Sequence, residues 1–122
     1  AGLVSPVSGE GLSYAIESGI LAANVAFKAI KNRSATYVTE YEQRLKQGIL
    51  RELKELRYLA GILYKSSANV ELICTIADED SVIREYLTDI VARVKSVDDL
   101  WNDLRKRMLL HHPLKAIRLG LP

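Results

Sequence analysis

The chain begins with AGLVSPVSGEGLSYAIESGILAA, residues 1–23, and this stretch passes from a loop composition to a helical pattern. Serine, proline and glycine dominate residues 5–9, so we expect a loop there and a helix that starts between Glu10 and Leu12. Apolar and small residues then recur in steps of three and four. These positions are Leu12, Ile16, Gly19, Ala23, Phe27 and Ile30. Basic residues follow, as the helix dipole favours, and the helix should end around Asn32.

A second, longer helix is predicted over residues 34–65, with one apolar face and one charged face. The apolar face consists of Tyr37, Tyr41, Leu45, Ile49, Leu53, Leu56, Ala60 and Leu63. Gly48 and Gly61 interrupt the pattern, and each costs about 1 kcal/mol relative to alanine inside a helix.

Further helices are predicted towards the C-terminus. Residues 69–77 are rich in apolar side chains and favour a helix over a strand. Asp80 or Ser81 can cap another helix that runs to Val94. Its inner face should hold Val82, Ile83, Tyr86, Leu87, Ile90, Val91 and Val94.

The last helix should start after Ser96, which with Asp99 forms a near capping box for residues 97–110. Pro113 then breaks or kinks the tail. Because no alternating strand with a hairpin turn is present, the predicted fold class is mainly α.

Length, charge and composition limit the classes of protein to which this chain can belong. The 122 residues suffice for one domain at most, and 17 basic residues against 15 acidic ones give no global field that would attract nucleic acid. The single cysteine, Cys74, has apolar neighbours that predict a buried thiol. No run approaches the roughly 20 apolar residues of a spanning helix, so we expect a cytoplasmic protein. The chain lacks an initiating methionine, and we expect it to be part of a longer polypeptide.

The N-terminal stretch also carries chemical information. Its glycines allow the backbone to approach a flat or anionic ligand, and the first N–H groups of the following helix favour negative charge. A ridge of small residues along that helix permits close packing against another backbone. This ridge consists of Gly11, Ala15, Ser18, Gly19, Ala22 and Ala26. The alternative is a plain turn and helix cap without a ligand.

The same stretch resembles the second flavin motif of the geranylgeranyl reductases, a family of hydroxylase-like flavoproteins. The matching residues are Ala1-Gly2-Leu3-Val4, Pro6, Gly9-Glu10-Gly11, Tyr14-Ala15, Glu17-Ser18-Gly19 and Ala22-Ala23. In that family the motif opens with Gly-Asp, whose Asp holds the ribityl chain of FAD, and this chain would start just after that pair.

The resemblance implies the helical C-terminal region of an FAD-dependent α/β reductase that acts on isolated double bonds of geranylgeranyl chains. It implies FAD as cofactor, an isoprenoid lipid substrate and an electron donor in the complete protein. The implied flavin-binding residues are Gly2, Leu3, Val4, Pro6, Gly9, Glu10, Gly11 and Leu12. Residues 1–32 would end the FAD motif, and their helix would pack on a dinucleotide-binding domain outside this chain. Residues 33–122 would form the C-terminal helical region. Catalytic residues would lie upstream, so this part alone should not turn over.

Other candidate sites are weaker. His111 and His112 are adjacent and point about 100° apart on a helix, which suits metal chelation poorly, so no metal site is predicted. The acidic run 78–80 favours a solvated loop with a helix cap. The tail over residues 105–118 mixes basic and apolar residues, so it could make peripheral contact with a membrane surface or dock on the core.

Two alternatives to the reductase remain open at this stage. The first is a stand-alone α-helical protein-interaction module whose glycine-rich start is only a turn. The second is part of another flavoprotein, such as an electron-transfer flavoprotein dehydrogenase, because the motif is shared in outline.

Overall fold

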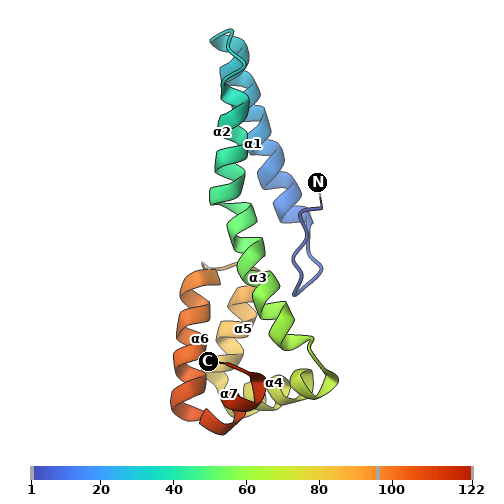
Figure 1. The fold of residues 1–122 in the computed structure, drawn as a ribbon, viewed down its shortest axis with the longest axis vertical. Helices are drawn as coiled ribbons and strands as arrows, with labels where there is room; N and C mark the ends of the chain where they lie inside the picture. Colours follow the sequence, from blue (N-terminus) through green and yellow to red (C-terminus); the bar gives the residue numbers. More distant parts are fainter. Residues whose placement is uncertain (1, 96, 122) are drawn as a thin grey trace. The chain divides into compact units, whose positions relative to one another are not determined.

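A computed structural model describes residues 2–95 and 97–121, and these residues form helices and turns without a strand (Figure 1). The helices are α1 (Leu12–Lys31), α2 (Tyr37–Gln47), α3 (Ile49–Leu63), α4 (Ser67–Glu79), α5 (Ser81–Ala92), α6 (Val97–His111) and α7 (Pro113–Leu119). The predicted mainly α class is confirmed. Two compact units divide the chain, Ala1–Lys54 and Glu55–Pro122.

In the first unit, α1 and α2 lie side by side as an antiparallel pair (Figure 1). The chain reverses at Arg33, which adopts a left-handed conformation with φ of 49°. The Arg33 N–H donates to Ile30 O at 3.2 Å and the Ser34 N–H donates to Ala29 O at 3.0 Å. These two bonds form a Schellman motif, which satisfies the last carbonyls of α1.

One carboxylate ties α1 to α2. Glu40 accepts a hydrogen bond from Lys28 Nζ at 2.9 Å and forms an ion pair with Arg44 at 2.5 Å. The hydrogen bond from Lys28 is the largest cause that lowers the pKa of Glu40. Because all three side chains are solvent-accessible, the cluster fixes the pairing of the helices more than it adds stability.

The second unit contains the remainder of α3 and the helices α4 to α7. Its core is aliphatic, with buried side chains from each helix. The most deeply buried of these are Leu56, Ile76, Ile83, Ile90, Leu100 and Ala116. At the edge of the core, the rings of Tyr58 and Trp101 meet edge to face, with centroids 5.8 Å apart. Such a contact adds about 0.5–1.5 kcal/mol beyond burial.

Asp80 joins α4, α5, α6 and α7 at one end of this unit. Its side chain caps α5 by accepting hydrogen bonds from the N–H groups of Val82 and Ile83, as the sequence predicted. The same carboxylate accepts from Arg107 Nε at 2.8 Å and lies 3.3 Å from His112 Nε2. These contacts, led by the one to Arg107, lower the pKa of Asp80 to about 2.

Some predicted helix boundaries are wrong. The predicted helix over 34–65 is divided at Gly48, whose backbone leaves the helical region with φ of −100° and ψ of −102°. The helix predicted to run to Val94 ends at Ala92, because Arg93 adopts φ of 54° and closes a second Schellman motif. Ser96, the predicted cap of the last helix, lies outside the described residues, and α6 starts at Val97 as predicted.

Two burial predictions are also wrong. Val91 and Val94, predicted on an inner face, are 53% and 66% exposed, because Val91 points about 100° away from the buried Ile90 and Val94 follows the end of α5. Cys74 is exposed, not buried. Ile73 and Ile76, its neighbours on α4, face the core, and the cysteine falls on the other side of the helix.

Candidate functional site

The predicted flavin motif forms a folded-back loop before α1. The Ser5 N–H donates to Glu10 O at 2.7 Å, and the Gly9 N–H donates to Ser5 O at 2.9 Å. Gly2 and Gly9 adopt left-handed conformations with φ of 68° and 74°, which glycine reaches without strain. The loop therefore has a fixed backbone shape of its own.

Ser5 holds the tip of this loop together. It is only 5% exposed, and its hydroxyl oxygen accepts long hydrogen bonds, both 3.3 Å, from the N–H groups of Val7 and Ser8. Gly11 marks the tightest approach of the backbone, because a Cβ there would lie 3.1 Å from Leu3 O and 3.1 Å from a methyl group of Val4. The resemblance implies flavin contact at Gly11, and the structure also gives this residue a packing role.

Glu10 caps the start of α1. Its carboxylate accepts from the Ser13 N–H at 2.8 Å and from the Ser13 hydroxyl at 2.7 Å. One N–H group of the first helical turn is therefore already occupied by a protein anion. The sequence interpretation predicts that all of these groups face a ligand, and this contact corrects it, because an acidic side chain at the start of a helix accepts hydrogen bonds from its first N–H groups.

The predicted site residues differ in exposure. Leu3 is 8% exposed and belongs to the core of the first unit, so its side chain points away from solvent. Val4 and Leu12 are 49% and 72% exposed, and Pro6 is half-buried. Gly2 and Gly9 are exposed, and no atom lies within 4 Å of a Cβ built on either. Open space on this loop is thus found at Gly2, Val4, Gly9 and Leu12.

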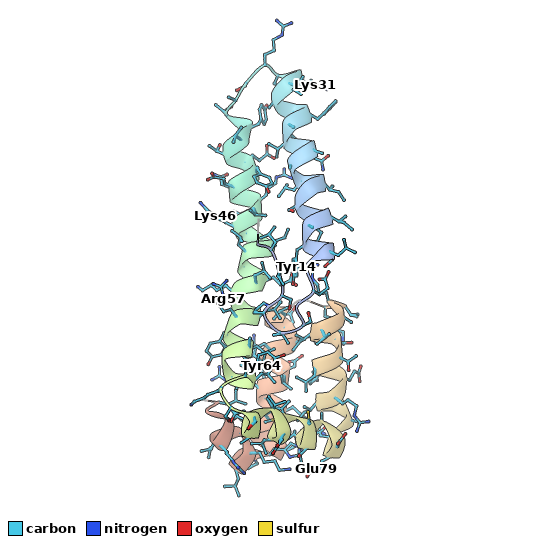
Figure 2. The ribbon with its side chains drawn as sticks, turned by 90° about the vertical axis from the view of Figure 1, so that its right-hand side faces the viewer. Tyr14, Lys31, Lys46, Arg57, Tyr64 and Glu79 are labelled. Carbon is cyan, nitrogen blue, oxygen red and sulfur yellow. The ribbon has the colours of Figure 1, made fainter. Side chains whose placement is uncertain are left out.

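Tyr14 follows the loop and fixes the start of α1 to α3. Its side chain is fully buried, and its hydroxyl donates to Glu52 Oε1 at 2.8 Å (Figure 2). The periodicity of α1 did not predict Tyr14 as a core residue. Its neighbour on the buried side is Val25, three turns further along the helix.

The opposite side of α1 carries an exposed apolar stripe. Its members are Leu12, Ile16, Ile20, Phe27 and Ile30, which are 54–77% exposed. The small residues of the predicted ridge are also accessible, since Ala15, Gly19, Ala22 and Ala26 are exposed. The face that a surface helix exposes to solvent is normally polar, so this exposed apolar face has the character of an interface.

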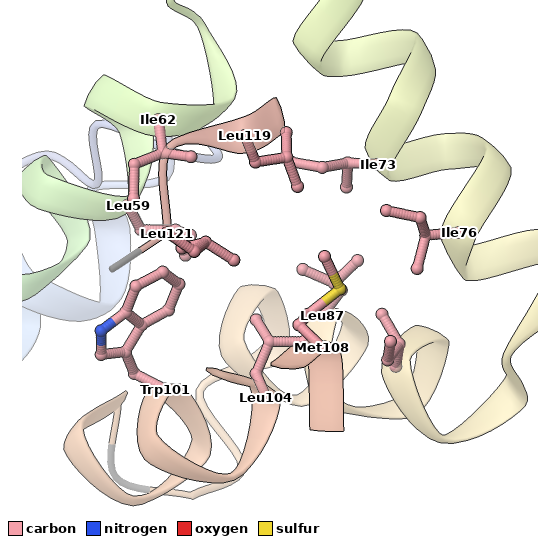
Figure 3. Close-up of a pocket in the computed structure, with 11 residues that line it drawn as sticks. Leu59, Ile62, Ile73, Ile76, Leu87, Trp101, Leu104, Met108, Leu119 and Leu121 are labelled. Atoms are coloured by element: carbon pink, nitrogen blue, oxygen red, sulfur yellow. The ribbon is translucent and has the colours of Figure 1, made fainter. Parts of the chain in front are cut away.

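The second unit contains a partly open apolar cavity of about 30 Å³ (Figure 3). Its lining is aliphatic side chains with Met108 and Trp101. The volume would hold a water molecule but offers it almost no polar partner, and it is far smaller than a flavin or a prenyl chain. The cavity is therefore a packing gap in the core and not a cofactor site.

The histidines do not assemble a metal site. His111 is exposed, whereas His112 is turned inward to Asp80. Across residues 2–95 and 97–121, no group of three or more histidine, cysteine, aspartate or glutamate side chains could hold a metal ion. In the same ranges, no helix is long and apolar enough to cross a membrane.

Comparison with known proteins tests the resemblance to the geranylgeranyl reductases. The chain is 38% identical over 90 residues to digeranylgeranylglycerophospholipid reductase 3 of Methanosphaera stadtmanae, a match that covers 72% of this chain and 20% of that protein. It is 35% identical over 82 residues to the digeranylgeranylglycerophospholipid reductase of Methanococcus aeolicus, covering 65% of this chain and 21% of that protein. The resemblance to the geranylgeranyl reductases is confirmed.

The match to these reductases is much longer than the 23 residues that first suggested the resemblance, because it covers 90 and 82 residues of the chain. The chain spans about a fifth of the length of the curated relatives it matches. No family model and no solved structure matches the chain.

Proposed function

We propose that this chain is the C-terminal, mostly helical part of an FAD-dependent reductase that saturates isolated double bonds of geranylgeranyl chains. The observation that carries the proposal is the similarity to two reductases named for a digeranylgeranyl lipid, together with a glycine-rich loop of defined shape before α1. The substrate would be an isoprenoid lipid, and an electron donor would serve the complete protein. Residues 1–32 would complete the flavin site, and residues 33–122 would form the C-terminal helical region.

The loop fits a flat ligand through its backbone. Gly2 and Gly9 offer open space, and Val4 and Leu12 add exposed apolar surface on either side of the turn. When bound, FAD would supply the hydride chemistry that reduces an alkene. Glu10 and Ser5 would shape the loop, because their polar atoms are already hydrogen-bonded within it.

The exposed stripe on α1 supports a place beside a larger domain. The relatives are about five times longer than the stretch that matches, so most of such a polypeptide lies outside this chain. A dinucleotide-binding domain that covered Ile16, Ile20 and Phe27 would remove three large apolar side chains from water. Each would contribute about 1.5–3 kcal/mol when fully buried.

The test uses a longer polypeptide that contains this chain and retains flavin. We expect Val4→Glu to lower the flavin content, read from visible absorption, because the new carboxylate would stand on the ligand side of the loop. Val38→Glu, at a similarly exposed valine on α2, should leave the flavin content unchanged. Equal flavin content in both variants would mean that the loop is not part of the flavin site.

Activity is tested separately. The longer polypeptide, supplied with a chemical reductant and a digeranylgeranyl lipid, should add two hydrogen atoms per reduced double bond, measured by mass spectrometry. Retained flavin without any reduction of the lipid would favour another flavoprotein class. A polypeptide that never binds flavin would favour the helical interaction module.

The proposal includes peripheral contact with a membrane through residues 105–118. An enzyme that acts on the prenyl chains of a lipid must meet them where they are inserted, at a bilayer. The basic and apolar residues of this segment are the part of the chain suited to such contact.

A further inference from the structure

Charge is distributed unevenly along the chain. Residues 104–121 contain five lysines and arginines and no carboxylate side chain. Since the whole chain has 17 basic and 15 acidic residues, the remaining sequence is net acidic. The basic segment comprises the second half of α6, the turn at Pro113 and α7.

Four of the five cations of this segment fall into two groups, and the fifth, Arg105, is half-buried and has an interaction of its own within the chain. Arg107 pairs with Asp80, the cap of α5, and Lys115 pairs with Glu79 at the end of α4. Lys106 and Arg118 are exposed, and among the described residues neither forms an ion pair. Two positive charges therefore remain available to an external partner.

Large aliphatic side chains stand beside these two cations. Leu110, Leu114 and Ile117 are 78%, 82% and 69% exposed. On α6, Leu110 is four residues after Lys106, and on α7, Leu114 is four residues before Arg118, so each pair shares a helix face. We call Lys106, Leu110, Leu114, Ile117 and Arg118 the basic-apolar tip.

The tip is held in place by the unit behind it. Met108 on α6 and Ala116 and Leu119 on α7 are buried in the core, and they fix which faces of the two helices turn outward. The His112 N–H donates to Met108 O at 2.9 Å and the Ala116 N–H donates to His112 O at 2.8 Å. The exposed side chains are therefore carried by two helices that pack on the core, and not by an irregular tail.

We propose that the basic-apolar tip docks on the surface of an anionic lipid bilayer. Aliphatic side chains would enter the level of the acyl-chain boundary, and Lys106 and Arg118 would extend to lipid phosphates at the rim. This inference rests on the proposed function for its setting and names the residues that make the membrane contact. The charge of the tip is complementary to an anionic lipid.

The exposed stripe on α1 is the natural comparison. It has more apolar surface than the tip, but Glu17 lies beside it and no lysine or arginine precedes Lys28. An anionic surface would therefore attract the tip more strongly than the greater part of the stripe. The two surfaces differ in charge, which makes the stripe a matched control.

The experiment is flotation of the 122-residue chain with two kinds of vesicle. One is phosphatidylcholine alone, and the other has roughly a third of that lipid replaced by phosphatidylglycerol. We expect binding to the anionic vesicles that falls as salt is raised. Leu114→Asp with Ile117→Asp should reduce it by at least tenfold, and Lys106→Gln or Arg118→Gln should each reduce it about fivefold.

Ile16→Asp with Ile20→Asp introduces the same two charges into the α1 stripe and should leave binding within about twofold of the original chain. Helix content from circular dichroism confirms that each variant is folded. If the α1 variant abolishes binding and the tip variant does not, the tip is not the docking surface. The same conclusion follows if no folded form binds anionic vesicles, or if the tip variants change the size of the chain in solution, which would assign the tip to a second copy.

These outcomes are distinguishable from failure of the proposed function. Flavin content and lipid reduction are measured on the longer polypeptide, whereas vesicle binding is measured without flavin or substrate. A chain that binds vesicles through the tip would support the docking surface even if the longer polypeptide reduced no prenyl lipid.

Discussion

The hydroxyl of Tyr14 donates a hydrogen bond to Glu52 across 38 residues of sequence, and the ring that carries it is entirely buried. The bond fastens the first turn of α1 to α3 inside the first unit, directly after the glycine-rich loop. Tyr14→Phe keeps the ring and removes the hydroxyl. We expect it to lower the free energy of unfolding by about 1–2 kcal/mol, measured by urea denaturation followed by circular dichroism.

Tyr41→Phe provides the control for this variant. Tyr41 is half-buried on α2, and its hydroxyl forms no hydrogen bond among the described residues. Its substitution should change stability by less than about 0.5 kcal/mol. Equal effects of the two variants would mean that the bond to Glu52 adds nothing to the unit.

Removal of the Asp80 carboxylate should destabilise the second unit strongly. Asp80→Ala deletes the cap of α5 and leaves Arg107 without its partner, and we expect a loss of about 2–4 kcal/mol. Trp101 is the single tryptophan of the chain and lies in this unit, so its fluorescence during urea denaturation reports the unfolding of the unit. Asp78→Ala, at a neighbouring carboxylate that is 87% exposed, should leave the free energy of unfolding almost unchanged.

The same carboxylate predicts an acid transition. The hydrogen bond from Arg107 is the main cause that lowers the pKa of Asp80 to about 2, below its ordinary value of 3.8. A depressed pKa stabilises the fold above the unfolded-state pKa, and this contribution is lost as pH falls from about 4 to about 2. Trp101 fluorescence over this range should show a transition that is smaller in Asp80→Asn, and an identical curve in both chains would contradict the assignment.

Substitutions at two left-handed turn positions should change stability in opposite directions. Arg33 and Gly120 both occupy the left-handed position of a Schellman motif, with φ of 49° and 76°. Arg33→Gly relieves a side chain in this conformation and should raise stability by up to about 1 kcal/mol, whereas Gly120→Ala should lower it by about 1 kcal/mol. Thermal unfolding of both variants checks the pair, and a change of the same sign in both would contradict the explanation.

Local features of the fold were predictable from the sequence. The start of α1, the cap at Asp80 and the break at Pro113 depend on residues close in sequence, and each is present. Gly48 was recognised as a weak point, but its effect was underestimated, because helix propensity alone does not specify where a backbone bends. Val91 illustrates the same limit, since its exposure depends on which helices pack beside α5.

The candidate site shows a similar division. Composition predicted a loop before α1, because turns are coded locally, but it did not predict which of the loop positions are open. The bond from Tyr14 to Glu52 and the ion pair of Asp80 with Arg107 connect residues far apart in sequence. No periodicity in the sequence specifies such partners. The hydrogen bond from the Ser13 N–H to Glu10 is local, and it occupies a carboxylate for which the resemblance implies flavin contact.

The outward stripe on α1 also governs how the chain behaves at high concentration. Five large apolar side chains on one side of the helix, spaced by three, four or seven residues, offer one molecule a ready contact with another. Colloidal solubility, and not resistance to unfolding, should therefore limit a preparation of this chain by itself. Replacement of Phe27 or Ile30 by a charged residue would keep such a preparation monodisperse without touching the buried side of the helix.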